Sequence, residues 1–162
     1  MGSGKTTVGR LVATRLGWPI TDSDAAIEAT DGRTVREIRD TLGTDAMHEL
    51  EAAHLLGSLA ASTPTVICPA ASVVDEPACR AALADPSLLV AWLTARPETA
   101  AERFDDQAHR PRYGEDPVTF LAQQAASRGP HFREVADIEL ATDEATPDEL
   151  ASAIVQRAAA GG

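Results

Sequence analysis

A glycine-rich hexapeptide near the start of the chain constrains the fold more than any other feature. Residues 2–7 read Gly2-Ser3-Gly4-Lys5-Thr6-Thr7, directly before an apolar-periodic stretch, and Lys5 is the only lysine in the chain. Glycines let backbone N–H groups converge on phosphate oxygens, and the N-terminus of the following helix adds a favourable dipole. Lys5 can then reach the β- and γ-phosphates while the Thr6 hydroxyl ligates Mg²⁺. An ordinary turn before a helix is the competing interpretation, but the GKTT run favours a loop that binds a nucleoside triphosphate.

The phosphate-loop pattern also sets an expectation about what precedes it. The full pattern, G-x-x-x-x-G-K-[ST], extends upstream of Met1, and the loop normally follows a central strand of a parallel sheet. A buried strand contributes as much stability as a marginally stable domain possesses. We therefore expect that the natural protein starts upstream, that Met1 is internal, and that the chain as given is marginally stable.

Apolar periodicity predicts strands that alternate with helices, and so a doubly wound, mostly parallel α/β sheet with helices on both faces. The predicted strands are 18–21, 65–68, 88–93 and 138–140. The predicted helices are about 5–16, 77–83, 97–104, 117–134 and 147–159, with a helical region from Asp24 to about Ala60 that is broken at Gly32 and Gly43. Residues 1–162 read as one domain, and the polar, aperiodic stretch 105–116 is predicted to be a mobile lid.

Composition narrows the classes of partner. The formal net charge of −11 disfavours nucleic acid and anionic membranes. No apolar run approaches the length of a membrane helix, and no signal peptide is evident. Cys68 and Cys79 lack metal-site spacing and are expected to be buried thiols in a reducing cytoplasm.

Two carboxylates follow the strand after the first helix, in the segment Asp22-Ser23-Asp24. The carboxyl end of a parallel strand is where α/β proteins bind ligands. One carboxylate can hold Mg²⁺ through water, and the other can accept a proton from a hydroxyl that attacks the γ-phosphate. The alternative is that Asp22 or Ser23 caps the next helix. The phosphate loop upstream favours chemistry for both carboxylates.

Taken together, these motifs resemble the shikimate kinase family. The resemblance runs from the phosphate loop through Leu16-Gly17, Asp22-Ser23-Asp24, Gly32-Arg33 and Arg110-Pro111 to Val135-Ala136-Asp137-Ile138, which is nearly the whole chain. It implies a five-stranded P-loop kinase fold whose first strand is missing here. It also implies transfer of the ATP γ-phosphoryl group to the 3-hydroxyl of shikimate, a role in aromatic amino acid biosynthesis, and a monomer.

The resemblance assigns roles to particular residues. Gly2, Ser3, Gly4, Lys5, Thr6 and Thr7 would hold the ATP phosphates, and Thr6 with Asp22 would hold Mg²⁺. Asp24 would bind the acceptor hydroxyls and act as base. Arg103 would stack on adenine, Arg110 on the lid would approach the phosphates, and Arg128 would pair with the acceptor carboxylate. A lid-borne guanidinium suits the transition-state charge of phosphoryl transfer. The alternative is that these arginines are ordinary solvent-exposed surface residues without a role in binding.

Departures from the family pattern fall mainly on the acceptor side. Pro69-Ala70-Ala71 replaces three glycines, so a backbone donor is lost, and alanine resists positive φ. His48 occupies the place of a second carboxylate-binding arginine, and Arg39 the place of a pocket aromatic. On the lid, Arg112 and Tyr113 follow Pro111 where leucines are expected. A neutral imidazole cannot replace a bidentate guanidinium, so Ala70 and His48 are acceptor-site candidates of altered chemistry.

Three functions remain open from the sequence. The first is phosphorylation of shikimate. The second is a related kinase for another small hydroxylated acid or polyol, which the residues at 48 and 69–71 favour. The third is a catalytically weak nucleotide-binding paralogue, which the retained Asp22, Asp24, Arg110 and Arg128 oppose.

Overall fold

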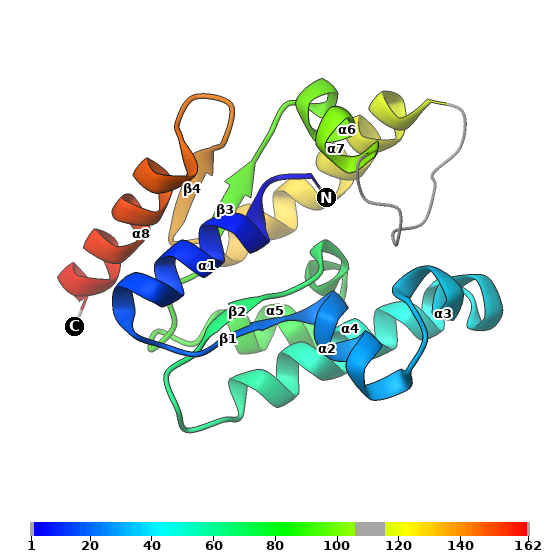
Figure 1. Cartoon of the computed structure of the whole chain (residues 1–162), viewed down its shortest axis with the longest axis horizontal. Coiled ribbons are helices and arrows are strands. Elements are labelled where there is room, and N and C mark those ends of the chain that lie inside the picture. Colours follow the sequence, from blue (N-terminus) through cyan, green and yellow to red (C-terminus); the bar gives the residue numbers. More distant parts are fainter. Residues whose placement is uncertain (1, 106–115, 162) are drawn as a thin grey trace.

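The strands form two parallel pairs in the computed structural model, which describes residues 2–105 and 116–161 (Figure 1). The pairs are β1 (Ile20–Asp22) with β2 (Val66–Cys68), and β3 (Ala91–Thr94) with β4 (Ile138–Ala141). Within the described ranges no strand joins β2 to β3. The predicted parallel α/β architecture is confirmed, but its strands stand as two separate pairs.

Helices alternate with these strands close to the predicted bounds. They are α1 (Lys5–Leu16), α2 (Ser23–Asp31), α3 (Val35–Leu42), α4 (Thr44–Leu59), the short 3₁₀ helix η1 (Ala71–Asp75), α5 (Pro77–Leu83), α6 (Pro97–Asp105), α7 (Pro117–Val135) and α8 (Pro147–Gly161). Local signals explain several ends. Thr34 and Glu37 form a capping box that starts α3, and Asp116 caps α7 before Pro117. Among the described helices, none has both the length and the apolar character needed to cross a membrane.

The largest difference from the predicted elements lies at the strand expected over 88–93. The observed strand β3 covers Ala91–Thr94, because the chain before it forms a turn in which the Leu88 N–H donates to the Asp85 carbonyl at 3.0 Å. Val90 is held from outside the strand, since its N–H donates to an Asp137 carboxylate oxygen at 2.8 Å. A continuous apolar run marks buried residues without marking where pairing begins.

Side chains of the strands alternate between two layers of helices. Val66, Leu93 and Leu140 pack against a buried cluster from α1 and α8, formed by Val8, Val12, Leu150 and Ala151. Ile67 packs against the opposite cluster, formed by Leu55, Val73, Val74, Cys79 and Val135. Because successive strand side chains point to opposite faces, α1 and α8 cover one face, and α4, α5 and α7 cover the other, as Figure 1 shows.

A third, smaller cluster secures the helices that follow β1. Ile27, Val35, Ile38 and Met47 are buried together, one from α2, two from α3 and one from α4. Ile38 is fully buried. This packing fixes α2 against α4, and it thereby orients the segment Asp22–Asp24 that leads from β1 into α2.

Candidate functional site

The phosphate loop adopts a conformation that its glycines permit. Gly2 has φ 67° and Gly4 has φ 76°, in the left-handed region that other residues rarely adopt. A Cβ atom on Gly2 would also collide with the backbone of Ala100 in α6. Gly4 is the N-cap of α1 and provides no capping side chain. The first N–H groups of α1 therefore remain available to an anion at the helix N-terminus.

Thr6 and Asp22 meet where α1 begins and β1 ends. The Thr6 hydroxyl donates to Asp22 Oδ2 at 2.7 Å, and the Asp24 backbone N–H donates to Asp22 Oδ1 at 3.2 Å. Partial burial raises the pKa of Asp22, but the Thr6 hydrogen bond, the charge of Lys5 and two backbone N–H groups outweigh burial and lower it. Asp22 is therefore an anion that both caps α2 and contacts the phosphate loop, so the structure combines the two alternatives that the sequence left open.

Asp24 lies in the first turn of α2, one residue beyond a fully buried serine. The Ser23 hydroxyl donates to Asp24 Oδ1 at 3.3 Å, and Asp24 is itself half-buried. The charge of Asp24 acts on a second buried carboxyl group, that of Glu51 on α4. Asp22 and Asp24 thus lie at the same strand end, with Asp22 toward the phosphate loop and Asp24 toward α4.

Glu51 is a site residue that the sequence did not single out. Its carboxylate accepts a short hydrogen bond from the hydroxyl of Ser72, a buried residue of η1. The pKa of Glu51 is raised to about 6, because burial and, to a lesser extent, the charge of Asp24 outweigh the lowering effects of the Ser72 hydrogen bond, Arg128 and Lys5. The one available sequence signal was its position three residues after His48, which places both on one face of α4.

Two residues of the predicted acceptor side, Arg128 and His48, are close enough for the charge of one to act on the other. Arg128 on α7 forms an ion pair with Asp75 at the end of η1, with Nε and NH2 at 2.8 and 2.7 Å from the same oxygen, Oδ2. His48 is half-buried on α4. Burial and then the charge of Arg128 lower the pKa of His48, although the carboxylates of Asp75, Asp45 and Glu76 oppose this. His48 is therefore a neutral neighbour of Arg128 at pH 7.

Pro69-Ala70-Ala71 leads from β2 into η1 without needing glycine. Ala70 has φ −63° and ψ 154° and is the N-cap of η1. None of the described residues other than glycine has a positive φ. The backbone of this segment is thus unstrained, and the expected difficulty of alanine at positive φ does not arise.

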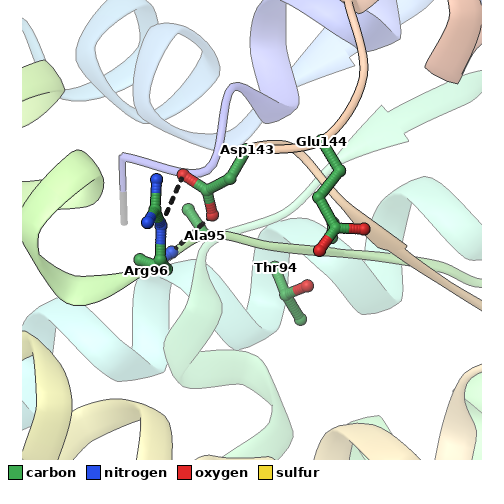
Figure 2. Close-up of a pocket in the computed structure, with 6 residues that line it drawn as sticks. Thr94, Ala95, Arg96, Asp143 and Glu144 are labelled. Carbon is green, nitrogen blue, oxygen red and sulfur yellow. Dashed lines mark hydrogen bonds and ion pairs between the residues drawn. The ribbon is translucent and has the colours of Figure 1, made fainter.

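Arg103 lies between the phosphate loop and the end of β4. Its NH1 donates to the Thr142 hydroxyl at 2.8 Å and to the Gly2 carbonyl at 3.5 Å. Beside it is a cavity of about 430 Å³ at the carboxyl ends of β3 and β4. The cavity is lined by Thr94, Ala95, Arg96, Ala141, Asp143 and Glu144, which Figure 2 draws as sticks.

Asp143 joins the two sides of this cavity. Its Oδ2 accepts the Arg96 N–H at 2.7 Å, and its Oδ1 lies 3.8 Å from Arg96 Nε (Figure 2). Hydrogen bonds, first from the Thr99 hydroxyl and then from the Arg96 backbone, lower the pKa of Asp143. Asp143 thereby ties the loop after β4 to the start of α6, which carries Arg103.

Part of the predicted lid lies outside the described residues. Asp105 ends α6 and Asp116 caps α7, but residues 106–115 are not described. Arg110, Pro111, Arg112 and Tyr113 belong to this segment. The predicted contact of Arg110 with phosphates therefore stays a prediction.

The donor set near the loop suits a magnesium ion that is also bound by phosphates. Within residues 2–105 and 116–161 there is no group of three or more His, Cys, Asp and Glu side chains that could hold a metal. The Thr6 hydroxyl and the ionised Asp22 carboxylate supply oxygen ligands 2.7 Å apart. Mg²⁺ prefers oxygen and commonly takes only one or two carboxylates plus substrate phosphates, so these residues fit the ion.

Neither thiol contributes chemistry to this site. Cys68 and Cys79 are free and buried. Burial raises the pKa of Cys68 to about 11, so its thiol stays protonated. Cys68 lies under the start of α1, with Sγ 3.7 Å from the Lys5 carbonyl oxygen, and its role there is packing.

Comparisons with known proteins agree on one family. The shikimate kinase family model matches residues 1–159. The shikimate kinase of Symbiobacterium thermophilum is 36% identical over 160 residues, covering 97% of this chain and 91% of that protein. That of Thermobifida fusca is 34% identical over 161 residues, covering 99% and 92%.

Solved structures give the same result. The structure of shikimate kinase from Acinetobacter baumannii in complex with shikimate has a TM-score of 0.91 at 28% identity, and the match covers 99% of this chain and 89% of that one. Shikimate kinase from Aquifex aeolicus matches with a TM-score of 0.69 at 20% identity, which supports the fold alone; the match covers 100% of this chain and 95% of that one. The sequence and structural matches extend over nearly the whole chain, and this chain belongs to the shikimate kinase family, whose members are ATP-dependent small-molecule kinases.

Proposed function

We propose that this chain transfers the γ-phosphoryl group of ATP to the 3-hydroxyl of shikimate. The observation that carries the proposal is the 2.7 Å hydrogen bond from Thr6 of the phosphate loop to Asp22, two residues before Asp24. The charges of Lys5, Asp24 and Arg128 also all act on the pKa of the Glu51 carboxyl group. These residues come from α1, α2 and α7, and they would serve the phosphates, the acceptor hydroxyl and the acceptor carboxylate. Their convergence supports one site that holds both substrates.

The nucleotide half uses the loop backbone and Lys5. The N–H groups at the start of α1, together with the remaining loop residues Ser3 and Thr7, would bind the phosphate oxygens, and the Lys5 ammonium would neutralise charge on the transferred group. Arg103, which donates hydrogen bonds to Gly2 and Thr142, would face the adenine ring beside the cavity at β3 and β4. Arg110 would approach the phosphates from the lid.

Thr6 and Asp22 would hold Mg²⁺, which when bound neutralises charge on the β- and γ-phosphates. The low pKa of Asp22 keeps this carboxylate ionised at neutral pH. Its second oxygen stays fixed by the Asp24 N–H, so the carboxylate is oriented before the nucleotide binds.

Asp24 would act as the base. The acceptor hydroxyl oxygen forms a bond to the γ-phosphorus while the bond from that phosphorus to the β–γ bridging oxygen breaks. ADP leaves with the electron pair, and Asp24 takes the hydroxyl proton. Because the transition state is loose, correct placement of the hydroxyl contributes more than the strength of the base.

Arg128 would bind the acceptor carboxylate, with His48 and Ala70 at the edges of the same pocket. His48 is neutral there, so it can offer one N–H where the family pattern has a guanidinium. Ala70, at the start of η1, can contact the acceptor only through its backbone and methyl group. We expect weaker acceptor binding than with two arginines.

The same proposal includes a monomer with one domain, located in the cytoplasm. Two free, buried thiols suit a reducing compartment. The packing of α1 against α8 brings the two ends of the described chain into one layer (Figure 1). Sedimentation velocity at micromolar concentration tests the monomer directly.

The decisive experiment measures ADP release from Mg-ATP with and without shikimate, alongside Lys5→Ala. Shikimate-dependent ADP release that disappears in Lys5→Ala, with shikimate 3-phosphate as product, is the expected result. ATP binding without shikimate-dependent release would reject this acceptor. In that case a screen of other small hydroxylated acids distinguishes a kinase of changed specificity from a nucleotide-binding paralogue.

A further inference from the structure

Arg128, the cation assigned to the acceptor carboxylate, already holds a carboxylate of its own chain. Both Nε and NH2 contact Asp75 Oδ2, at 2.8 and 2.7 Å. The Arg128 side chain is only 12% exposed, whereas that of Asp75 is 40% exposed. The guanidinium of this pair is therefore largely buried, whereas the carboxylate faces solvent.

The backbone that carries Asp75 is firmly held. Val73 and Val74, immediately before it in η1, are 2% and 1% exposed. Arg80 NH1 donates to the carbonyl oxygens of Val74 and Asp75 at 2.6 and 3.1 Å. Because η1 is packed below and tied at its end, the Asp75 carboxylate meets Arg128 at little entropic cost, unlike most exposed ion pairs.

Among the described residues, the cations whose charges act on Glu51 are Arg128 and Lys5, and Lys5 is assigned to the phosphates. Position 48 is a neutral histidine, and Asp24 and Glu51 are carboxyl groups. Asp75 neutralises the nearby cation Arg128. An anionic acceptor must therefore displace Asp75 from Arg128, or bind beside a pair whose charge is already balanced.

We propose that Asp75 is a specificity-determining residue that occupies Arg128 in place of an acceptor carboxylate and so weakens the binding of anionic acceptors. The proposal deepens the proposed function and rests on Arg128 being the carboxylate-binding group. In the absence of acceptor, Asp75 also keeps the guanidinium from remaining unpaired in a largely buried position.

The test compares the wild type with Asp75→Asn, which keeps the shape of the side chain and removes its charge. Glu76→Gln is the matched control, because it removes one negative charge from the next residue, for which the described part of the chain shows no ion pair or hydrogen bond to Arg128. Shikimate and its methyl ester serve as charged and neutral acceptors. KM and kcat come from ADP release, and calorimetry measures shikimate binding directly.

We expect Asp75→Asn to lower the KM for shikimate about three- to tenfold with kcat nearly unchanged, since hydrogen bonds to charged groups are the strong ones and the pair is partly exposed. The KM for the methyl ester should change less than twofold in either variant. An unchanged or raised KM for shikimate overturns the proposal. An unchanged KM would mean that Asp75 does not compete with shikimate for Arg128, and a raised KM would mean that Asp75 positions Arg128 for binding. An equal gain for the ester overturns it as well.

Calorimetry separates this proposal from the proposed function. If the wild type binds shikimate without turnover, the proposed function fails, while tighter binding by Asp75→Asn still supports the role of Asp75. Binding of shikimate by Asp75→Asn but not by the wild type also supports it. Absence of binding by both proteins overturns it. Asp75→Ser provides a second charge-removing variant if the asparagine protein does not fold.

Discussion

The nucleotide half and the acceptor half of the proposed site are built differently. On the nucleotide side, backbone geometry does most of the work: Gly2 and Gly4 have positive φ, and α1 presents uncapped N–H groups. On the acceptor side, the site consists of side chains from α4, η1 and α7 that pair with one another, Glu51 with Ser72 and Arg128 with Asp75. A backbone site needs only its short motif, whereas a side-chain site changes with every substitution along three separate segments.

This contrast explains where the chain departs from the family pattern. Residues 2–7 of the phosphate loop keep the glycines, the lysine and the threonine that the pattern requires there. The acceptor side has changed at His48 and at 69–71 while its backbone stays unstrained. The fold thus tolerates new acceptor-side residues, and their effect falls on charge and hydrogen bonding within the pocket. The predictions below test whether the two halves respond to substitution as differently as their construction implies.

The largest expected effect is on the nucleotide side. Lys5→Ala should lower kcat about 10³-fold, because it removes a fixed charge that stabilises the transition state. Arg10→Ala, which removes an exposed cation from the same helix, should change kcat less than twofold. Steady-state ADP release measures both. Equal losses in the two variants would mean that the net charge of α1 matters and the position of Lys5 does not.

Asp24 lies between the proposed nucleotide and acceptor halves. Its replacement shows whether this carboxylate is needed for the chemical step or for ATP binding. Asp24→Asn should lower kcat about 10²-fold, within the range for general bases, and should leave ATP binding nearly unchanged. The control is Asp40→Asn on the exposed part of α3. Calorimetric titration with a non-hydrolysable ATP analogue checks the binding. A kcat within threefold of the wild type would remove Asp24 from the role of base.

Asp22 sharpens the comparison, because it is both a helix cap and a proposed metal ligand. Asp22→Asn should raise the Mg²⁺ concentration for half-maximal activity at least about tenfold. The same variant should keep the helix cap, since asparagine caps helices as well as aspartate does, and should lose only the stabilisation that the lowered pKa of Asp22 represents. Asp22→Ala should lose the cap in addition, at about 1 kcal/mol. Urea unfolding and Mg²⁺ titration separate the two roles, and an unchanged Mg²⁺ requirement in Asp22→Asn would leave capping alone.

Local sequence predicted most of the fold, and the structure brings two of its candidate residues, Thr6 and Asp22, into contact. The bounds of α1 and the identities of Lys5, Thr6 and Asp22 follow from motifs of a few residues. The start of β3 was wrong, because a turn at Asp85–Leu88 occupies the apolar run there. The sequence missed Asp75 and Glu51, since each becomes important only when η1, α4 and α7 meet in space. Nothing in the neighbouring sequence indicates that Ser72 binds Glu51.

The smallest expected effect concerns Glu51. The pKa of Glu51 is raised from 4.5 to about 6, chiefly by burial, so the folded protein binds its proton more tightly than the unfolded chain. The corresponding stabilisation is complete below pH 4.5 and is lost as the pH rises through 6. Glu51→Gln carries no proton to lose. Its free energy of unfolding should therefore equal that of the wild type near pH 4 and exceed it by about 2 kcal/mol at pH 8.

Urea unfolding of both proteins at pH 4 and pH 8 measures this difference. Glu49→Gln, on the exposed side of the same helix, provides the control and should show no pH-dependent gain. A gain of equal size at both pH values would mean that glutamine packs better and that the charge of Glu51 is irrelevant. A gain only at pH 8 would show that the acceptor half keeps a buried carboxylate at a cost in stability, a cost that the backbone-built nucleotide half does not carry.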